Sequence, residues 1–255
     1  MGVEYMILNG ELTPKQEIAG AYIYQYIHTV GYTARNLTQH LEIIDQTSRA
    51  LFGEPFKIGK REIEQHISTL LGSGHLSRKV SIRVTLKLYT TGDLSLEYDE
   101  PSFYNGYVMR SLRPKAICLR INPPLEAYPT SAAQATYGVA EAIARAKDYH
   151  TAIMIDSENI IRNDSSHPIA IVKGKTLILP ATTILSVERT LLERATRKAG
   201  YAVEYKALQQ ADLTSADEVL VMDWQGITAM EMVNGKPYMS ILAERIAEEL
   251  ESVTE

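Results

Sequence analysis

The chain has few of the residues that mark secreted, disulfide-bonded or membrane proteins. Its 255 residues include one cysteine, Cys118, one tryptophan and three phenylalanines. A single cysteine excludes an internal disulfide and is compatible with a reducing compartment, so we expect a cytoplasmic protein. The chain begins without a basic leader and has no long apolar run. We therefore expect neither a signal peptide nor a membrane span.

Basic clusters and several common catalytic motifs are also missing. The net charge is −5, and no Lys/Arg cluster is interleaved with aromatic residues. This argues against a nucleic-acid partner, which usually needs a basic face. The six histidines are scattered without an i, i+4 pair, so we expect no metal site. Neither a glycine-rich phosphate loop nor a Gly-x-Ser-x-Gly nucleophile motif is present.

The residues that are present indicate a folded α/β protein of two domains. Hydrophobic residues make up 45% and charged residues 22% of the chain, which is ordinary for a globular protein. The Asn122-Pro123-Pro124 segment interrupts the pattern, because proline fixes φ and lacks a backbone donor. We therefore predict a first domain over residues 1–122, a linker over 123–127 and a second domain over 128–255.

Hydrophobic periodicity predicts the main elements. Apolar residues recur at helical spacing, or form β-branched and aromatic runs between turn signals. In the first domain we predict strands at 5–8, 21–29, 80–89 and 116–121, and helices at 36–53 and 60–71. In the second domain we predict helices at about 131–147, 186–199 and 239–250, with strands at 151–156, 168–173, 176–179, 203–205 and 218–222.

The order of these elements resembles the class IV aminotransferases, which include branched-chain and D-amino acid aminotransferases and aminodeoxychorismate lyase. The loop Tyr128-Pro129-Thr130-Ser131, the alanine-rich helix after it and the strand Ala152–Asp156 carry the resemblance. The later strand Asp217–Val221 also fits. The resemblance covers nearly the whole chain. It implies the two-domain α/β fold, of α+β type, of the D-amino acid aminotransferase-like proteins that depend on pyridoxal phosphate (PLP).

Three positions that hold PLP in the family carry other residues here. Thr130 stands where the resemblance places the lysine that binds PLP covalently. Ile43 stands at an arginine that grips the cofactor phosphate, and Arg162 at a glutamate that holds the pyridine nitrogen. Without the lysine no internal aldimine can form, and the base for the proton shift is also lost.

The remaining landmarks of the family change in the same direction. Ser165 and Ser166 fall in a polar segment that has lost the family's asparagine and phenylalanine. At the helix start that binds phosphate in the family, Arg189 is kept but Glu188 would repel a phosphate dianion. Trp224 replaces small threonines. The candidate cleft positions are Thr130, Arg162, Ser165, Ser166, Glu188, Arg189 and Trp224.

The leading hypothesis is a class IV aminotransferase-like protein that has lost PLP-dependent catalysis. We then expect no cofactor, no confident catalytic residue, and binding of another small molecule or of a partner. The alternative is an active PLP-dependent aminotransferase or lyase with a relocated lysine, for which Lys115, Lys147, Lys173 and Lys175 are candidates. A third hypothesis is a structural subunit that pairs with an active paralogue.

Three structural expectations follow from the hypothesis. We predict a homodimer, because Tyr22, Tyr24 and Tyr26 alternate onto one face of a strand and tyrosine is common in interfaces. We predict that Arg162 lies within ion-pair distance of a carboxylate, with Glu188 and Asp164 as candidates, because an enclosed charge needs a partner. We also predict that Trp224 fills space in the former phosphate site.

Overall fold

The computed structural model describes residues 4–99, 101–162, 165–181 and 186–255. Contacts divide the chain into two compact units. Unit 1 comprises Met1–Gly106, Pro129–Ser131 and Thr254–Glu255, and unit 2 comprises Tyr107–Tyr128 and Ala132–Val253. The division by contacts thus falls at Tyr107, before the proline-rich segment where the sequence places the join. The reason is that strand β8 (Lys115–Arg120) pairs along its length with β9 (Thr151–Ile155) of unit 2.

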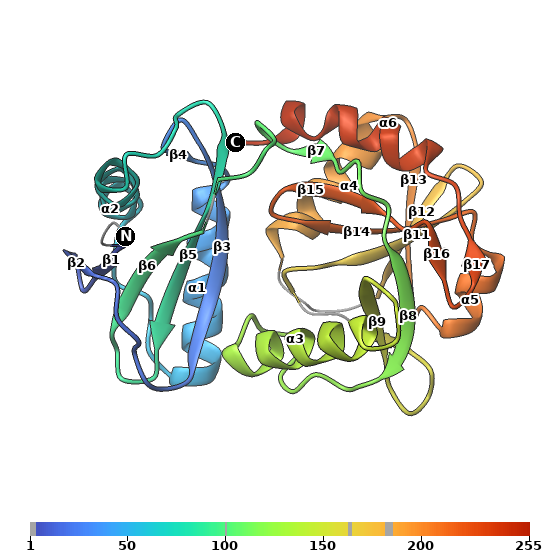
Figure 1. The fold of residues 1–255 in the computed structure, drawn as a ribbon, viewed down its shortest axis with the longest axis horizontal. Coiled ribbons are helices and arrows are strands. Elements are labelled where there is room, and N and C mark those ends of the chain that lie inside the picture. Colours follow the sequence, from blue (N-terminus) through green and yellow to red (C-terminus); the bar gives the residue numbers. More distant parts are fainter. Residues whose placement is uncertain (1–3, 100, 163–164, 182–185) are drawn as a thin grey trace. The chain divides into compact units, whose positions relative to one another are not determined.

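Unit 1 is a six-stranded antiparallel sheet with two helices on one face (Figure 1). The strand order is β2-β1-β6-β5-β3-β4. The strands are β1 (Tyr5–Leu8), β2 (Glu11–Pro14), β3 (Tyr22–Val30), β4 (Thr33–Ala34), β5 (Ser81–Tyr89) and β6 (Leu94–Tyr98). The helices are α1 (Leu37–Phe52) and α2 (Lys60–Ser73).

Strand alternation sorts the side chains of unit 1 onto two faces. Ile23 and Ile27 of β3 join a core that includes residues of both helices. Tyr22, Tyr24 and Tyr26 alternate with them, and their ring centroids lie 6.5 and 4.8 Å apart along the strand. Tyr24 is only 1% exposed, whereas Tyr22 and Tyr26 are half-buried. The apolar face of this strand therefore forms the core, and the tyrosines line the other face.

Unit 2 contains two sheets, four α-helices and the short 3-10 helix Glu251–Val253 among its described residues (Figure 1). The five-stranded sheet has the order β10-β9-β8-β16-β17, and the six-stranded sheet has the order β13-β12-β11-β14-β15-β7. The remaining strands are β7 (Val108–Met109), β10 (Ile161–Arg162), β11 (Ile169–Lys173), β12 (Thr176–Pro180), β13 (Ala202–Lys206), β14 (Glu218–Asp223), β15 (Gly226–Ala229), β16 (Met232–Val233) and β17 (Lys236–Pro237). The helices are α3 (Ser131–Arg145, from Ala132 onwards in unit 2), α4 (Val187–Lys198), α5 (Gln210–Ser215) and α6 (Ile241–Glu249).

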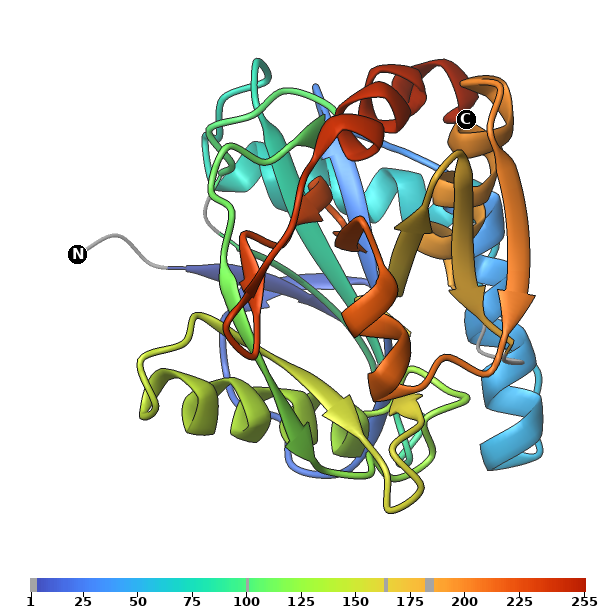
Figure 2. The same ribbon diagram turned by 90° about the vertical axis from the view of Figure 1, so that its right-hand side faces the viewer.

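Three packing interfaces hold unit 2 together: one between its two sheets, and one between each sheet and the helices that cover it. One core lies between the two sheets and includes Ile153 of β9, Ile171 of β11 and Val219 of β14. Helix α3 places Ala140 and Ala144 against β8 and β9, and both ribbon views show it running along these strands (Figure 2). Helices α4 and α6 contact each other and the six-stranded sheet. Each sheet of unit 2 is therefore covered by helices on the face turned away from the other sheet.

The α/β class, the long helices and the long strands agree with the sequence predictions. The predicted helix at 36–53, for example, is α1, and the predicted strand at 151–156 is β9. Short strands such as β2, β4, β6, β7 and β10 were not predicted. Strand β6 follows directly on a turn in which Gly92 adopts φ +90°, and a strand of five residues carries too little alternation to stand out. No helix of the described residues is long and apolar enough to cross a membrane.

Candidate functional site

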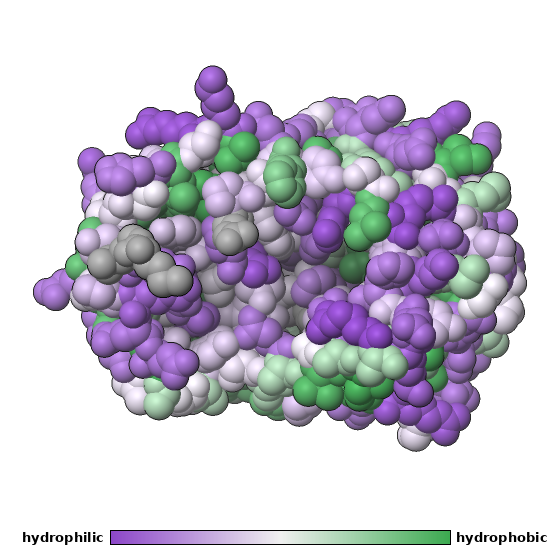
Figure 3. Space-filling model, viewed as in Figure 1, coloured by the Kyte–Doolittle hydropathy of each residue, from purple (hydrophilic) through white to green (hydrophobic). Residues whose placement is uncertain are grey.

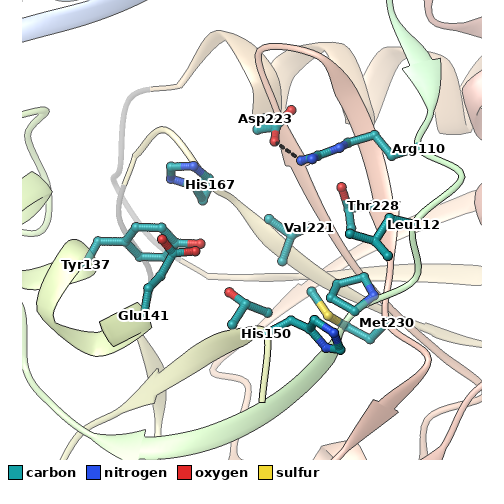
Figure 4. Close-up of a pocket in the computed structure, with 12 residues that line it drawn as sticks. Arg110, Leu112, Tyr137, Glu141, His150, His167, Val221, Asp223, Thr228 and Met230 are labelled. Atoms are coloured by element: carbon teal, nitrogen blue, oxygen red, sulfur yellow. Dashed lines mark hydrogen bonds and ion pairs between the residues drawn. The ribbon is translucent and has the colours of Figure 1, made fainter. Parts of the chain in front are cut away.

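A cavity of about 200 Å³ lies in unit 2, between one face of the six-stranded sheet and helix α3 (Figure 4). Val221 and Asp223 of β14 and Thr228 of β15 face it, because residues two apart on a strand point to the same side. Met230 lies just beyond β15, and Arg110 lies in the segment that follows β7. One wall of the cavity is thus built from two neighbouring strands and the segment next to them.

This wall carries an ion pair and an unpaired hydroxyl. The Arg110 Nη1 donates to the Asp223 Oδ2 at 3.0 Å, which is the dashed line in Figure 4. Arg110 therefore keeps further N–H donors for a ligand, because a guanidinium has five. The Thr228 Oγ1 is buried without a hydrogen-bond partner in the described part of the chain, and Thr228 is 9% exposed. A buried hydroxyl without a partner is costly, which suits a position that a ligand satisfies.

The opposite wall consists of Tyr137 and Glu141, which lie one turn apart on α3. The His167 ring stacks on Tyr137 with centroids 4.3 Å apart and an interplanar angle of 13°. His150 lies at the other end of the cavity, and its Nδ1 accepts the Lys115 backbone N–H at 3.0 Å. The neutral His150 ring therefore carries its proton on Nε2, where it is a donor.

The mouth of the cavity is polar and its floor is apolar. Figure 3 shows it as a hollow right of the centre, with hydrophilic residues around an apolar patch. Val221, Met230 and Leu112 supply apolar surface, while Glu141 and the histidines supply polar groups. A much smaller hollow of about 10 Å³ adjoins it, shares Tyr137, His167 and Val221, and reaches Arg162. No group of three metal-binding side chains occurs among the residues that the structure describes.

Arg162 has two carboxylate partners, and neither is one that the sequence named. Its Nε and Nη2 donate to the Asp156 Oδ2 at 3.0 and 2.8 Å, and its Nη1 donates to the Glu126 Oε1 at 2.8 Å. Burial pushes the pKa of Asp156 up, but hydrogen bonds from the Ile160 N–H, Arg162 and the Glu158 N–H outweigh it and lower that pKa. The expected ion pairing is confirmed, but Glu188 as its partner is wrong, and Asp164 lies outside the described residues. Asp156 was not considered as a partner of Arg162, because it is the last residue of the strand predicted at 151–156.

Glu188 instead bonds within the first turn of α4. Its Oε2 accepts the Ser186 hydroxyl at 3.0 Å, and Ser186 also accepts the Arg189 N–H at 3.2 Å as the N-cap of the helix. Burial raises the pKa of Glu188 to about 7, helped by Asp223 and opposed by Ser186 and His167. The Arg189 side chain turns to Glu193, with Nε to Oε1 at 3.1 Å. Glu188 and Arg189 therefore do not pair with each other.

The other four candidate positions are buried as well. Thr130 belongs to unit 1 and forms an antiparallel bridge with Ile23. Ser165 and Ser166 lie in unit 2 ahead of β11, and the Ser165 hydroxyl has no partner among the described residues. Trp224 lies between β14 and β15 and is 9% exposed. That Trp224 fills a former phosphate site stays a prediction. Of the seven candidate positions, Arg162 alone lines either of the two hollows described above.

The residues that line the cavity carry only weak signals in the sequence. Asp223 ends an apolar strand and Thr228 is a lone hydroxyl between Ile227 and Ala229, so both signals were present but weak. His150 and His167 were counted only as scattered histidines. Arg110 comes from the segment between the sheets, and nothing in its neighbours predicts its contact with Asp223.

Comparisons with known proteins agree on the fold. The family model of the class IV aminotransferases matches residues 23–223. No protein with a curated description matches the chain. Among solved structures, the branched-chain aminotransferase of Thermoproteus uzoniensis superposes with a TM-score of 0.80 at 15% identity, over 98% of this chain and 94% of that one.

Two further structures give the same result. The branched-chain aminotransferase of Escherichia coli has a TM-score of 0.79 at 15% identity, over 99% of this chain and 94% of its own. A Legionella pneumophila protein assigned as a 4-amino-4-deoxychorismate lyase has a TM-score of 0.77 at 17% identity, over 94% and 96% of the two chains. Sequence identities this low support a common fold only. The family model, in contrast, matches most of the sequence and therefore supports membership of the family. The chain belongs to the class IV aminotransferase family.

Proposed function

We propose that this family member has lost PLP-dependent catalysis and binds another small molecule in the cavity of unit 2. The observation that carries the proposal is the absence of a usable amine. Position 130 is threonine, and no lysine lines the cavity in the described part of unit 2. A Schiff base needs a lysine amine held against the cofactor, so the residues present do not fit PLP.

The α4 N-terminus argues in the same direction. A helix N-terminus binds phosphate through free backbone N–H groups. Here the Arg189 N–H already donates to the Ser186 Oγ, and the Glu188 carboxylate lies in the same turn. A carboxylate beside a phosphate dianion repels it when ionised. The donor set at this position therefore does not suit the phosphate of PLP either.

The lysines proposed for a relocated Schiff base do not improve the fit. Lys147, Lys173 and Lys175 are exposed, and none of them lines the cavity. Lys115 begins β8 and is half-buried, and its neighbour Pro114 rather than Lys115 lines the cavity. None of the four combines burial with access to the cavity, which a Schiff-base lysine requires.

The cavity supports binding of a small molecule that presents hydrogen-bond acceptors. The Arg110 guanidinium, the Thr228 hydroxyl and the His150 Nε2–H can all donate, while Val221, Met230 and Leu112 favour an apolar body. The Arg110 charge is offset by Asp223, so a full negative charge on the ligand is not required. A volume of about 200 Å³ suits a ligand of small-metabolite size.

Borohydride trapping tests the loss of PLP chemistry. The protein is incubated with PLP and reduced, and the adducts are located by mass spectrometry. We expect only scattered labelling of exposed lysines, equal in the wild type and in Lys115→Arg. Stoichiometric labelling of one lysine would contradict the proposal and favour an active PLP enzyme. Ligand-observed NMR with a fragment library tests the cavity, with Thr228→Val as the shape-matched control that removes the unpaired hydroxyl.

We also propose that the protein forms a homodimer. Tyr22 and Tyr26 keep part of their rings exposed on the tyrosine face of unit 1, whereas Tyr24 is buried. Arg83 lies over the Tyr26 ring at 4.3 Å and Lys87 over the Tyr22 ring at 5.3 Å, which orders the rings for contact. Light scattering at high concentration checks the proposal. A monomer in wild type would contradict it, and Tyr26→Glu should weaken a dimer that uses this face.

A further inference from the structure

The cavity of unit 2 presents hydrogen-bond donors and acceptors side by side. The Arg110 Nη1 donates to the Asp223 Oδ2 at 3.0 Å, and the Asp223 Oδ1 accepts the Gln225 N–H at 2.7 Å. A guanidinium has five N–H donors and a carboxylate about four acceptor positions, so both groups keep capacity for a ligand. The Arg110–Asp223 pair therefore offers a donor next to an acceptor at one end of the cavity (Figure 4).

The Thr228 hydroxyl is a second, independent sign of a polar ligand in this cavity. Its Oγ1 is buried and has no hydrogen-bond partner in the part of the chain that the structure describes, and Thr228 is 9% exposed. Figure 4 shows Thr228 on the wall that also carries the Arg110–Asp223 pair. A buried hydroxyl is costly when it makes no hydrogen bond, so a polar ligand atom next to it would remove that cost.

The charges that line the cavity disfavour an anionic ligand. One arginine, Arg110, stands against two carboxylates, Asp223 and Glu141, which leaves a formal charge of −1 when His150 and His167 are counted as neutral. A carboxylate or phosphate that approached Arg110 would also meet the Asp223 carboxylate, and like charges repel in a partly enclosed site. A cationic ligand would in turn bring its donors against the Arg110 guanidinium. The lining therefore favours a neutral ligand.

The walls of the cavity suit a flat ring. The Tyr137 and His167 rings are stacked with centroids 4.3 Å apart and an interplanar angle of 13°, and both residues line the cavity. Aromatic side chains give flat surfaces on which another ring can pack, and Val221 and Met230 add apolar surface from the sheet side. The volume of about 200 Å³ is below the roughly 300–1,000 Å³ of sites for drug-sized ligands, so it suits a single ring.

We propose that the cavity of unit 2 binds a small, neutral, flat heterocycle with a cis-amide edge, that is, a ring N–H beside a ring carbonyl, as in lactams and pyrimidinones. The inference rests on the proposed function and names the ligand class of that same cavity. The ring carbonyl accepts from Arg110, the ring N–H donates to Asp223, and the Thr228 hydroxyl bonds a further polar atom of the ligand. A ligand with two acceptors places one of them against Asp223, and a ligand with two donors places one against Arg110, so both lose affinity.

Four flat probes of similar size test this ligand class on the wild-type protein. The lactam 2-pyridone has one donor beside one acceptor, and N-methyl-2-pyridone lacks the donor. Benzoate has two acceptors, and benzamidine has two donors. Saturation-transfer NMR titrations at equal ionic strength give the dissociation constants. We expect 2-pyridone to bind at least about tenfold more tightly than each of the other three, because each of these leaves one member of the Arg110–Asp223 pair unmatched.

Variants of the wall separate recognition from a loss of packing. Asp223→Asn keeps the side-chain shape but removes the repelling charge, so the preference for 2-pyridone over benzoate should fall about tenfold. A variant that only loosened the cavity would weaken both probes alike and keep their ratio. Thr228→Val removes the unpaired hydroxyl and should weaken 2-pyridone binding about fivefold. Glu204→Gln removes a charge from an exposed position of β13 and should change neither value.

The outcomes distinguish a wrong ligand class from a wrong function. The inference is overturned if 2-pyridone binds no tighter than benzoate or benzamidine in the wild type, a comparison that needs no variant. An unchanged affinity in Thr228→Val overturns it too. If other fragments bind and lose affinity in Thr228→Val while 2-pyridone does not bind, the cavity remains a small-molecule site and only the ligand class is refuted. A single lysine labelled with borohydride refutes the loss of PLP chemistry, whereas 2-pyridone binding is measured without PLP.

Discussion

The two units bury their ionisable groups differently. In unit 1 the fully buried His40 is held neutral: its Nδ1 meets the Gln25 Oε1 at 2.8 Å, and burial with the nearby His28 lowers the pKa of His40 to about 3. In unit 2 the buried ionisable groups include carboxylates, and two of them lie at helix ends, Glu188 at α4 and Glu218 at α6. Unit 1 should therefore lose stability when acid protonates His40. The stability of unit 2 depends instead on where its buried carboxylates lie.

The difference supports the cavity of unit 2 as the candidate site for a polar ligand. A neutral hydrogen-bonded pair such as His40 and Gln25 is stabilised within the core and offers nothing to a small molecule. Unit 2 combines a cavity, the Arg110–Asp223 ion pair and the unpaired Thr228 hydroxyl, and it keeps Glu188 near the charge of Asp223. Buried charges and unpaired donors are costly, and they concentrate where function requires them.

The largest expected effect is the acid response of unit 1. The folded pKa of His40 lies below the value in the unfolded chain, so its contribution is present above about pH 6.5 and is lost as the pH falls. The loss reaches at most about 4 kcal/mol near pH 3. His40→Asn keeps a donor for Gln25 but does not titrate, so its unfolding free energy should depend less on pH. Urea unfolding followed by circular dichroism between about pH 4 and pH 7 measures this.

Fluorescence assigns that acid response to one unit. Trp224 is the only tryptophan of the chain and belongs to unit 2, so its emission reports unit 2 alone. If the free energy of unfolding changes equally with pH in the wild type and in His40→Asn, His40 is not the cause of the acid response of unit 1.

Glu218→Gln should have the next largest effect, in unit 2. The amide keeps only one acceptor oxygen and no charge, so one of the Leu242 and Ala243 N–H groups loses its partner. We expect the free energy of unfolding to fall by about 3 kcal/mol. Trp224 fluorescence in urea measures the change. The matched control is Glu244→Gln, an exposed position of α6, which should change stability by less than about 0.5 kcal/mol.

Glu188→Gln should act in the opposite direction at alkaline pH. The folded pKa of Glu188 is raised by burial to about 7, so its stabilising protonated form is lost as the pH rises through that value. At about pH 8 the variant should be more stable than wild type by about 2 kcal/mol, and the gain should vanish near pH 5. Denaturation at both pH values checks the sign. A gain that is equal at both would show that ionisation of Glu188 is not the cause.

The smallest expected effect compares two glycines. A Cβ on Gly138 of α3 would meet nothing within 4 Å, so Gly138→Ala should stabilise unit 2 by about 0.8 kcal/mol through helix propensity. A Cβ on Gly74 in unit 1 would lie 2.8 Å from the Tyr98 hydroxyl, so Gly74→Ala should destabilise unit 1 by about 1 kcal/mol. Thermal melts by circular dichroism measure both. Equal signs for the two variants would contradict the packing argument.

Periodicity and composition determined the order of the long elements of this protein. The apolar spacing in α1 and the β-branched runs of β3 and β9 lie within a few neighbouring residues, so the sequence alone specifies them. The sequence alone also shows that position 130 itself cannot form a Schiff base, because threonine has no amine in any packing. Short strands such as β6 have too few residues for an alternating hydrophobic pattern to identify them.

Tertiary structure decided which side chains meet. Arg110 and Asp223 form the ion pair of the cavity although 113 positions separate them, and Glu126 reaches Arg162 across 36. The sequence predicted that Arg162 needs a carboxylate, because an enclosed charge is costly alone, but any of several acids satisfies that need. Likewise Glu188 is buried only because α4 packs with α6 and β14. The local sequence shows that an enclosed charged side chain needs a partner of opposite charge. The packing of distant segments determines which residue is that partner.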